Sequence, residues 1–281
     1  MVEAYRPSSL EEALKIRADK GALPFAGGTD LMVKYRYESG AVPEYPAPVI
    51  FLTHLEEIRK IYSQDGELHL GAGTSLAELM SHSEVPELLK EAVRTIAAPG
   101  LRNTATLAGN ICNASPAADG VCALYALDSR VKLSSPRSSR ELAIYEFITG
   151  PGKTELREDE LLTEIIIPRD RSTTRLFRKV GTRKANALSK LSIAAAARLS
   201  GERVDEVRIA LGAVAPTVLR SVELEKQIQG LSRAELSERL EHFVQSYEAM
   251  VQPIDDQRST AVYRKKVAVN LLRQFLTSIA A

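Results

Sequence analysis

Residues 23–31, Leu-Pro-Phe-Ala-Gly-Gly-Thr-Asp-Leu, carry the pattern that decides the fold of this chain. The first four predict a brief buried strand, the Gly27-Gly28 pair begins a turn, and Leu31 and Tyr35 then resume helical spacing. Backbone N–H groups in such a turn can approach a phosphate closely, because glycine has no side chain to hold the ligand away. Taken alone, the loop also fits a plain turn capped by Thr29.

A second glycine loop, Thr106-Leu107-Ala108-Gly109-Asn110, lies inside Ala97 to Asp119, a segment rich in small residues with little apolar periodicity. Irregular segments of that length are uncommon unless they have a function. Its continuation, Asn113 to Asp119, is dense in small hydrogen-bonding groups that could surround an extended polar ligand. By itself the segment fits either ligand binding or a connection.

Around these loops, helix and strand signals alternate. Ser9 with Glu12 and Ser75 with Glu78 have the spacing of capping boxes, each ahead of a short amphipathic helix. Further predicted elements are strands at Val49–Leu52, Leu68–Ala72, Val131–Leu133 and Ile165–Ile167, a helix at Pro86–Ile96 and a short buried element at Val121–Leu127. Three prolines within Ala41 to Pro48 indicate a linker.

The last third of the chain has a different pattern. Leu191 to Leu199 and Val207 to Val214 are apolar runs joined around Ser200-Gly201, which predicts an antiparallel hairpin. The residues spaced for one apolar stripe on a terminal helix are Val262, Val269, Leu272, Leu276 and Ile279. With a second boundary near Arg169 to Thr174, the expected domains are 1–48, 49–170 and 171–281.

The composition is that of an ordinary globular protein. The 281 residues include 37 Lys and Arg against 36 Asp and Glu, for a formal net charge of +1, and 44% are hydrophobic. The charge balance and the absence of Trp argue against a dedicated nucleic-acid binder, which needs basic excess and aromatic stacking. Arg169 to Lys190 holds eight basic residues and one acid, which fits a solvated strand pair or a patch for an anionic cofactor.

Several kinds of chemistry are excluded. Cys112 and Cys122 are too few for a disulfide framework or a four-thiolate cluster, so any iron–sulfur chemistry must come from a partner. Gly152-Lys153-Thr154 imitates the end of a phosphate loop, but Phe147 stands where that pattern requires glycine. The four histidines lack metal-pair spacing, so no metal site is expected.

The first ten residues have no signal-peptide core, and no apolar run reaches the roughly 18 residues of a membrane span, so a cytoplasmic location is expected.

Three motifs together closely resemble the FAD-binding (medium) subunit of molybdenum hydroxylases, the carbon monoxide and xanthine dehydrogenase family. They are Ala26 to Leu31, Arg102 to Asn110 and Gly150 to Thr154, and the likeness continues through Asp255 to Arg264. The resemblance implies an α+β fold: a two-lobed FAD-binding domain of the vanillyl-alcohol oxidase type and a small C-terminal α+β domain. One departure is Ala108, where the family usually has the first glycine of a pair.

The resemblance also implies the cofactor site. The two loops would hold the pyrophosphate and ribityl of FAD from opposite lobes, and Leu162 and Lys179 would lie near the flavin ring. A lysine there could stabilise negative charge on the reduced flavin. The implied cofactor-binding residues are Ala26, Gly27, Gly28, Thr29, Asp30, Leu31, Thr106, Gly109, Asn110, Cys112, Asn113, Asp119, Leu162 and Lys179. Cys112 is interpreted as a small packing residue of the second loop, and no catalytic acid, base or nucleophile is assigned.

The resemblance predicts an electron-transfer flavoprotein subunit. Neither loop contains histidine, so non-covalent FAD is expected. Molybdopterin would be carried by a large partner subunit and [2Fe–2S] clusters by a small one, in a dimer of heterotrimers, with electrons passed on to an external acceptor. Two alternatives stay open: a stand-alone FAD-dependent oxidoreductase, and a nucleotide-binding scaffold without redox activity.

Overall fold

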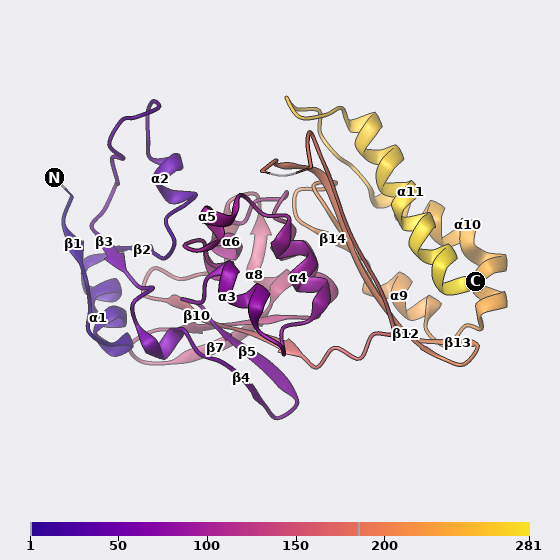
Figure 1. Ribbon diagram of the computed structural model, residues 1–281, viewed down its shortest axis with the longest axis horizontal. Helices are drawn as coiled ribbons and strands as arrows, with labels where there is room; N and C mark the ends of the chain where they lie inside the picture. The colour runs from indigo at the N-terminus through magenta and orange to yellow at the C-terminus, as the bar shows by residue number, and fades with distance from the viewer. Residues whose placement is uncertain (1, 185) are drawn as a thin grey trace. The chain divides into compact units, whose positions relative to one another are not determined.

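The computed structural model describes residues 2–184 and 186–281, and the chain divides into two compact units (Figure 1). The first unit contains Met1–Val85, Ala97–Ala114 and Ser129–Pro168. The second contains Pro86–Ile96, Ser115–Asp128 and Arg169–Ala281. Because the chain passes between the units several times, two helices from the first 170 residues belong to the unit that also holds the C-terminal part.

A three-stranded parallel sheet begins the first unit. Its strands are β1 (Ala4–Tyr5), β3 (Val49–Phe51) and β2 (Leu23–Phe25), in that order, with β3 in the middle. Helix α1 (Leu10–Lys20) connects β1 to β2; Ser9 caps its start and Gly21, in the left-handed conformation, ends it. After β2, the 26–30 loop leads into α2 (Leu31–Lys34), so the predicted strand, glycine loop and helix are confirmed.

A five-stranded antiparallel sheet forms the rest of this unit. Its order is β4 (Ile61–Gln64), β5 (Glu67–Gly71), β10 (Leu161–Pro168), β6 (Arg130–Ser134) and β7 (Ser139–Ala143). Asp65 and Gly66 both have positive φ, as a two-residue hairpin between β4 and β5 requires. The shorter elements are η1 (Glu56–Ile58), α3 (Leu76–Ser81), α5 (Pro99–Arg102), α6 (Leu107–Asn113), α8 (Ile144–Phe147), β8 (Ile148–Gly150) and β9 (Lys153–Thr154). Helix α6 packs against the central strand β10.

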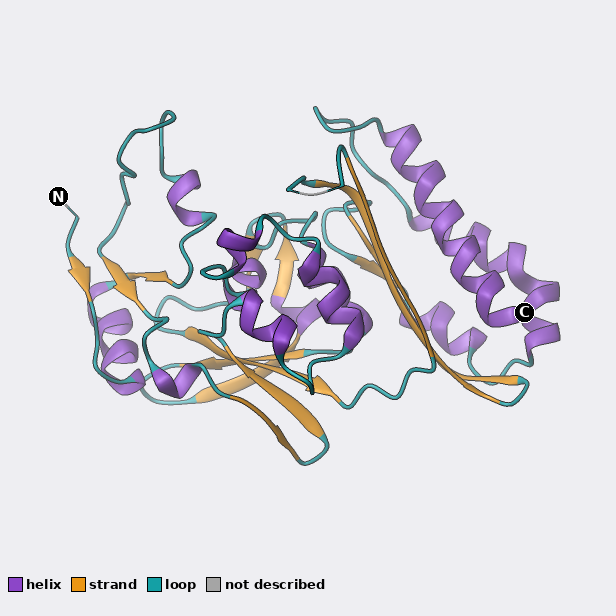
Figure 2. Cartoon of the chain, in the orientation of Figure 1, coloured by secondary structure: helices purple, strands orange, loops and turns teal. Residues whose placement is uncertain are grey.

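The second unit is built on a four-stranded antiparallel sheet. Its strands follow chain order: β11 (Thr174–Gly181), β12 (Ser189–Ser200), β13 (Arg203–Gly212) and β14 (Leu219–Arg220). The predicted hairpin is therefore confirmed as β12 and β13. Figure 2 shows the long helices α10 (Arg233–Met250) and α11 (Ala261–Ala280) along this sheet, and α9 (Val222–Ile228) precedes them. Alternate β12 residues such as Leu191 and Ile193 pack with Phe243 and Phe275 in one apolar core.

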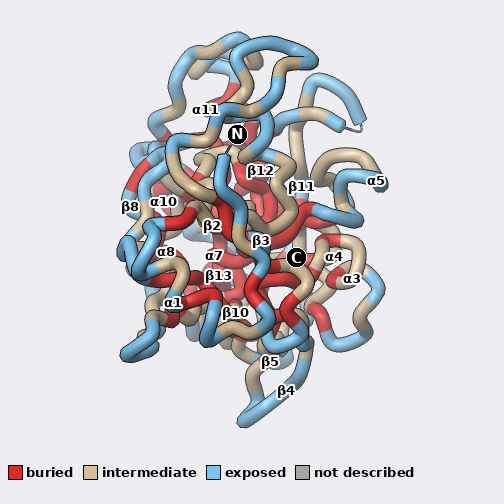
Figure 3. Tube along the Cα trace, turned by 90° about the vertical axis from the view of Figure 1, so that its left-hand side faces the viewer, coloured by how far each residue is buried: buried red, intermediate tan, exposed pale blue. Residues whose placement is uncertain are grey.

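Small residues on the intervening positions of β12 and β13 admit a helix on the other face of this sheet. Helix α7 (Asp119–Ala126) is buried along its whole length, and α4 (Glu87–Arg94) packs beside it (Figure 3). The thiol of Cys122 lies 3.5 Å from the carbonyl oxygen of Ala210. A Cβ added at Gly212 would lie 2.5 Å from Ser192 Oγ on the neighbouring strand β12, so that side chain would have to move.

Two expectations are wrong. Ala97 to Asp119 is not one long loop, since it contains α5 and α6; Pro99 begins the first and Thr106 caps the second. Helices of four and seven residues are too short to show an apolar period, which is why the sequence pattern missed them. Val262 is 80% exposed instead of continuing the stripe of α11, because the apolar core on that helix begins only at Val267 and Ala268, about a turn and a half further along.

The described residues contain no helix with the length and apolar content that a membrane span requires. They also contain no group of three or more His, Cys, Asp or Glu side chains placed to hold a metal ion.

Candidate functional site

The first glycine loop is packed too tightly for side chains at its two glycines. A Cβ at Gly27 would lie 2.1 Å from the carbonyl oxygen of Thr104, far inside contact distance. A Cβ at Gly28 would lie 2.3 Å from the ring of Phe25, and the φ of Gly28 is +68°, where side chains are strained. Gly27 therefore lets the loop lie directly against the segment that precedes the second loop, and Gly28 lets the turn pack on Phe25.

This turn leaves a row of backbone donors unpaired. Among residues 2–184 and 186–281, no acceptor is found for the N–H groups of Gly27, Gly28 and Thr29, whereas Met32 N–H donates to the Gly28 carbonyl at 2.8 Å. The three donor residues are half-buried. Successive unpaired N–H groups in a turn form a concavity that suits an anion.

The second glycine loop is the start of α6. The Thr106 hydroxyl caps this helix by accepting the Gly109 N–H at 3.0 Å. Asn110 Oδ1 is buried and has no hydrogen-bond partner in the described part of the chain. Asn113 Nδ2 donates to Asp30 Oδ2 at 3.1 Å, which joins the end of the second loop to the first. Segments that lie about eighty residues apart in the sequence thus converge in one unit.

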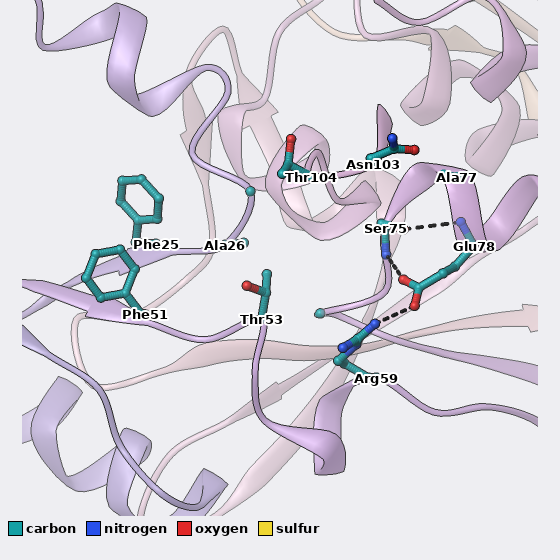
Figure 4. Close-up of a pocket in the computed structure, with 12 residues that line it drawn as sticks. Phe25, Ala26, Phe51, Thr53, Arg59, Ser75, Ala77, Glu78, Asn103 and Thr104 are labelled. Carbon is teal, nitrogen blue, oxygen red and sulfur yellow. Dashed lines mark hydrogen bonds and ion pairs between the residues drawn. The ribbon is translucent and has the colours of Figure 1, made fainter. Parts of the chain in front are cut away.

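A cavity of about 580 Å³ opens beside the first loop, in the size range of small-molecule sites (Figure 4). It lies at the carboxyl ends of the parallel strands β2 and β3, the edge where open parallel sheets bind ligands. Its lining residues are Phe25, Ala26, Gly27, Phe51, Thr53, Arg59, Gly73, Ser75, Ala77, Glu78, Asn103 and Thr104. All belong to the first unit.

The charged groups of this cavity are paired with each other. Arg59 Nη2 donates to Glu78 Oε1, and Ser75 N–H donates to Glu78 Oε2 at 2.7 Å. The capping box predicted from Ser75 and Glu78 is confirmed, since Glu78 N–H also donates to Ser75 Oγ at 3.2 Å. Burial raises the pKa of Glu78, but the Ser75 donors and the Arg59 guanidinium outweigh it and hold that pKa below its ordinary value. Glu78 is therefore a fixed, ionised acceptor.

Cys112 and Leu162 are among the expected residues that do not line this cavity. Cys112 is half-buried in α6, and burial raises the pKa of its thiol to about 12, so it is neutral at pH 7. Leu162 is buried in β10, next to the point where the pairing of β10 with β6 shifts register. Cys112 thus has the properties of a packing residue.

Asp119 and Lys179 lie in the second unit and contact each other. Lys179 Nζ is 2.7 Å from Asp119 Oδ2 and donates to the Thr95 carbonyl at 3.0 Å. Ser189 Oγ donates to Asp119 Oδ1 at 2.6 Å. Both charged side chains are almost fully buried, at 11% and 5% exposure. No sequence pattern indicated that these two residues contact each other, and the structure makes them an ion pair.

The structure adds residues that sequence reasoning missed. Of the expected residues only Ala26 and Gly27 line the cavity, together with Arg59, Thr53 and Phe51, which no motif singled out. The Ser75 and Glu78 spacing was a usable signal, but it was interpreted only as a helix start. Asn103 and Thr104 stand within the quoted motif ahead of the second loop without an assigned role.

Comparison with protein families accounts for nearly the whole chain. Residues 1–170 match the FAD binding domain in molybdopterin dehydrogenase, and residues 176–279 match the CO dehydrogenase flavoprotein C-terminal domain.

Individual relatives agree with these matches. The chain is 30% identical to the glyceraldehyde dehydrogenase medium chain of Sulfolobus acidocaldarius over 98% of its own length and 97% of that protein. It is 32% identical to a putative xanthine dehydrogenase FAD-binding subunit of Escherichia coli, over 80% of this chain and 78% of that one. A carbon monoxide dehydrogenase structure from Hydrogenophaga pseudoflava superposes with a TM-score of 0.89 at 28% identity, covering 99% of this chain and 96% of that chain. The chain therefore belongs to the family of FAD-binding subunits of molybdopterin dehydrogenases, as an α+β oxidoreductase subunit whose cofactor is FAD.

Proposed function

We propose that this chain is the electron-transfer flavoprotein subunit of a molybdopterin-dependent dehydrogenase. When bound, FAD supplies a redox centre that accepts electrons from iron–sulfur clusters of a small partner and delivers them to an external acceptor. Substrate hydroxylation belongs to a large molybdopterin-binding partner in this scheme. The support is the family membership and the relatives, which are themselves medium chains or FAD-binding subunits.

The observation that carries the proposal is the convergence of the two glycine loops. The free N–H groups of Gly27, Gly28 and Thr29 suit the pyrophosphate of FAD, which is an anion that such donors can hold. The unpaired Asn110 Oδ1 suits a hydroxyl donor, as the ribityl chain would provide. Because these groups lack protein partners, the residues present fit the cofactor.

The expected site residues are assigned to successive parts of the cofactor. Ala26 to Leu31 would hold the pyrophosphate, and residues of the second loop would hold the ribityl: Thr106, Gly109, Asn110 and Asn113. Cys112 would pack within that loop beside the cofactor. Asp119 would also contact the cofactor at the end of this segment, and Leu162 and Lys179 would lie near the flavin ring. No histidine stands in either loop, so we expect FAD to be bound without a covalent link. Acid precipitation should release free flavin.

The positive charge of Lys179 is balanced by the carboxylate of Asp119. Its ammonium group is held by the carboxylate of Asp119 at 2.7 Å, so the pair presents less net charge than a free lysine would. The chain would tune the flavin through the position of this pair. An unchanged flavin potential in Lys179→Ala would remove that role.

Partners follow from the cysteine content. Cys112 and Cys122 are the two cysteines of the chain, and they belong to different units, so the clusters must be carried by another subunit. We propose a small iron–sulfur subunit and a large molybdopterin subunit, assembled as a dimer of heterotrimers in the cytoplasm. Copurification of these two subunits with the tagged chain from its native source tests the assembly.

The first test is the visible absorbance of the purified chain before and after adding FAD. A two-banded flavin spectrum is expected. Turnover of a substrate by the isolated chain would favour the stand-alone oxidoreductase instead. A chain that stays colourless with FAD would overturn the proposal in favour of the scaffold.

A further inference from the structure

We propose that Arg208 is an ionic latch: a buried cation whose ion pairs hold two connections of the chain and break before the second unit unfolds. The connections are those by which the chain enters and leaves Ser129–Pro168, a part of the first unit. Arg208 Nη1 pairs with Asp128, just before the first connection, and Nη2 pairs with Asp170, just after the second. These three side chains all belong to the second unit, and the inference does not depend on the cofactor.

The first connection is held firmly by a second arginine. Arg220 Nη1 donates to the Asp128 carboxylate and, at 2.6 Å, to the carbonyl oxygen of Tyr125 near the end of α7. Arg220 Nη2 donates to Glu225 Oε2 at 2.9 Å, and Glu225 Oε1 accepts the Ile209 N–H at 2.8 Å. The side chains of Arg220 and Glu225 are 8% and 5% exposed. Because charge-assisted hydrogen bonds of this length are strong, the end of α7 stays fixed.

Arg208 is as buried as Arg220 but is more loosely paired. Its side chain is 8% exposed, and its ion pairs with Asp128, Asp170 and Glu206 are 3.5, 3.6 and 3.5 Å long. Charge-assisted hydrogen bonds are shorter, at about 2.7–2.9 Å. Within the part of the chain that the structure describes, Arg208 Nε has no hydrogen-bond partner. Releasing Arg208 therefore breaks weak contacts and lets water solvate a guanidinium that is poorly compensated where it is buried.

The second connection depends on this latch for its attachment. Asp170 accepts the N–H and the hydroxyl of Ser172, both at 3.0 Å, but these bonds stay within the segment 169–172. Attachment to β12 begins only with the N–H of Thr173. Counting only described residues, Arg208 is the one side chain outside 169–172 that this segment contacts by a hydrogen bond or ion pair. Release of Arg208 therefore frees this connection locally.

Asp128 couples the firm contact to the loose one. It follows Leu127, the C-cap of α7, and its φ is +52°, a left-handed conformation that glycine or asparagine usually adopts after a helix. An aspartate at this position adds a carboxylate, and each of its oxygens pairs with a different arginine. The oxygen held by Arg220 fixes the carboxylate, and the other oxygen provides a stationary partner for Arg208.

The test measures where trypsin cuts the folded full chain. Arg171 is exposed within 169–172, so cleavage after it reports opening of the second connection. The side chain of Arg264 is 3% exposed in α11, so cleavage after it requires unfolding of the second unit. Mass spectrometry gives the rate at each site for the unaltered chain, Asp170→Asn, Arg208→Met and the double variant.

Asp205→Asn is the matched control. Asp205 lies in β13 of the same unit and also pairs with an arginine, Arg198, at 3.6 Å. This ion pair joins β12 to β13 and lies away from both connections. The control therefore removes the same charge and an ion pair of the same length without touching the latch.

We expect the unaltered chain to be cut slowly after Arg171. Asp170→Asn and Arg208→Met should each speed this cleavage about tenfold, or about 1.4 kcal/mol in the free energy of local opening. The double variant should be cut no faster than Arg208→Met, because both changes remove the same contact. Cleavage after Arg264 should stay unchanged in all of these variants, and Asp205→Asn should change neither rate.

Other outcomes reject the latch. Equal acceleration after Arg171 and Arg264 would show that the substitutions only destabilise the whole second unit. An unchanged rate after Arg171 in Asp170→Asn, or a double variant whose acceleration is the product of the single ones, would show that Arg208 does not hold Asp170. Equal acceleration by Asp205→Asn would show that loss of any such ion pair loosens the segment.

Discussion

At the scale of single residues, Gly27 is the position where the backbone leaves least room. A Cβ there would lie 2.1 Å from the Thr104 carbonyl oxygen, which is backbone and cannot rotate away. We expect Gly27→Ala to cost about 1–3 kcal/mol of stability, as overpacking does, and to reduce FAD affinity because the loop must move. Gly100→Ala is the control, since a Cβ there meets nothing within 4 Å. Thermal unfolding with and without FAD measures both effects, and equal behaviour of the two variants would contradict the expectation.

The Asp119 and Lys179 pair gives a second prediction at this scale. Lys179→Met leaves the buried Asp119 carboxylate without its cation, so we expect a loss of about 3–5 kcal/mol in the free energy of unfolding. Lys179→Met combined with Asp119→Asn should recover part of that loss, because no unpaired charge remains. Urea denaturation of both single variants and the double variant forms the cycle. Strictly additive effects would show that the pair is not coupled.

At the scale of elements, the start of α11 is held by Asp256. This carboxylate accepts Arg258 Nη2 at 2.6 Å, the Arg258 N–H at 2.8 Å and a guanidinium nitrogen of Arg264. Burial raises the pKa of Asp256, but the two arginines outweigh it and hold that pKa well below its ordinary value of 3.8. The segment before α11 is thereby tied to the first turn of the helix.

The depressed pKa of Asp256 predicts an acid-dependent contribution to stability. Since its folded pKa is below its unfolded pKa, the stabilisation is present above about pH 4 and is lost as the pH falls through the folded value. Asp256→Asn should therefore be less stable than the unaltered chain at pH 7, and the difference should shrink below about pH 4. Urea unfolding at several pH values checks this, and a difference that stays constant with pH would refute it.

At the scale of the whole molecule, the end of the FAD-binding family match does not coincide with the division of the chain into two compact units. The FAD-binding family match ends at residue 170, yet α4 and α7 belong to the unit formed with Arg169–Ala281. All eight residues of α7 are buried, and the helix packs on β12 and β13. A fragment cut at residue 170 would therefore expose a helix that needs the sheet.

We expect the fragment 1–170 to bind a dye for exposed apolar surface and to be cleaved by protease within 115–128. The full chain should resist cleavage there. A fragment that is protected in this segment and binds FAD with full affinity would show that α7 does not require the sheet.

Several secondary-structure elements of this protein could be predicted from local sequence patterns alone. The capping box at Ser75, the glycine pair at 27 and 28 and the apolar runs of β12 and β13 depend on near neighbours, so their elements could be predicted. The motifs also identified the family and FAD. The sequence failed where elements were too short for a period, as in α5 and α6, and where a helix extends past its core, as at Val262.

Only the tertiary structure decided which distant groups meet. No periodicity relates Asp30 to Asn113, Arg59 to Glu78 or Asp119 to Lys179, because each contact depends on how strands and helices pack over long sequence separations. The cavity likewise exists only where the ends of β2 and β3 lie beside α3 and the 103–104 segment. The sequence thus determined the cofactor through local motifs, whereas packing decided the walls of the site, because burial and pairing are properties of the folded chain.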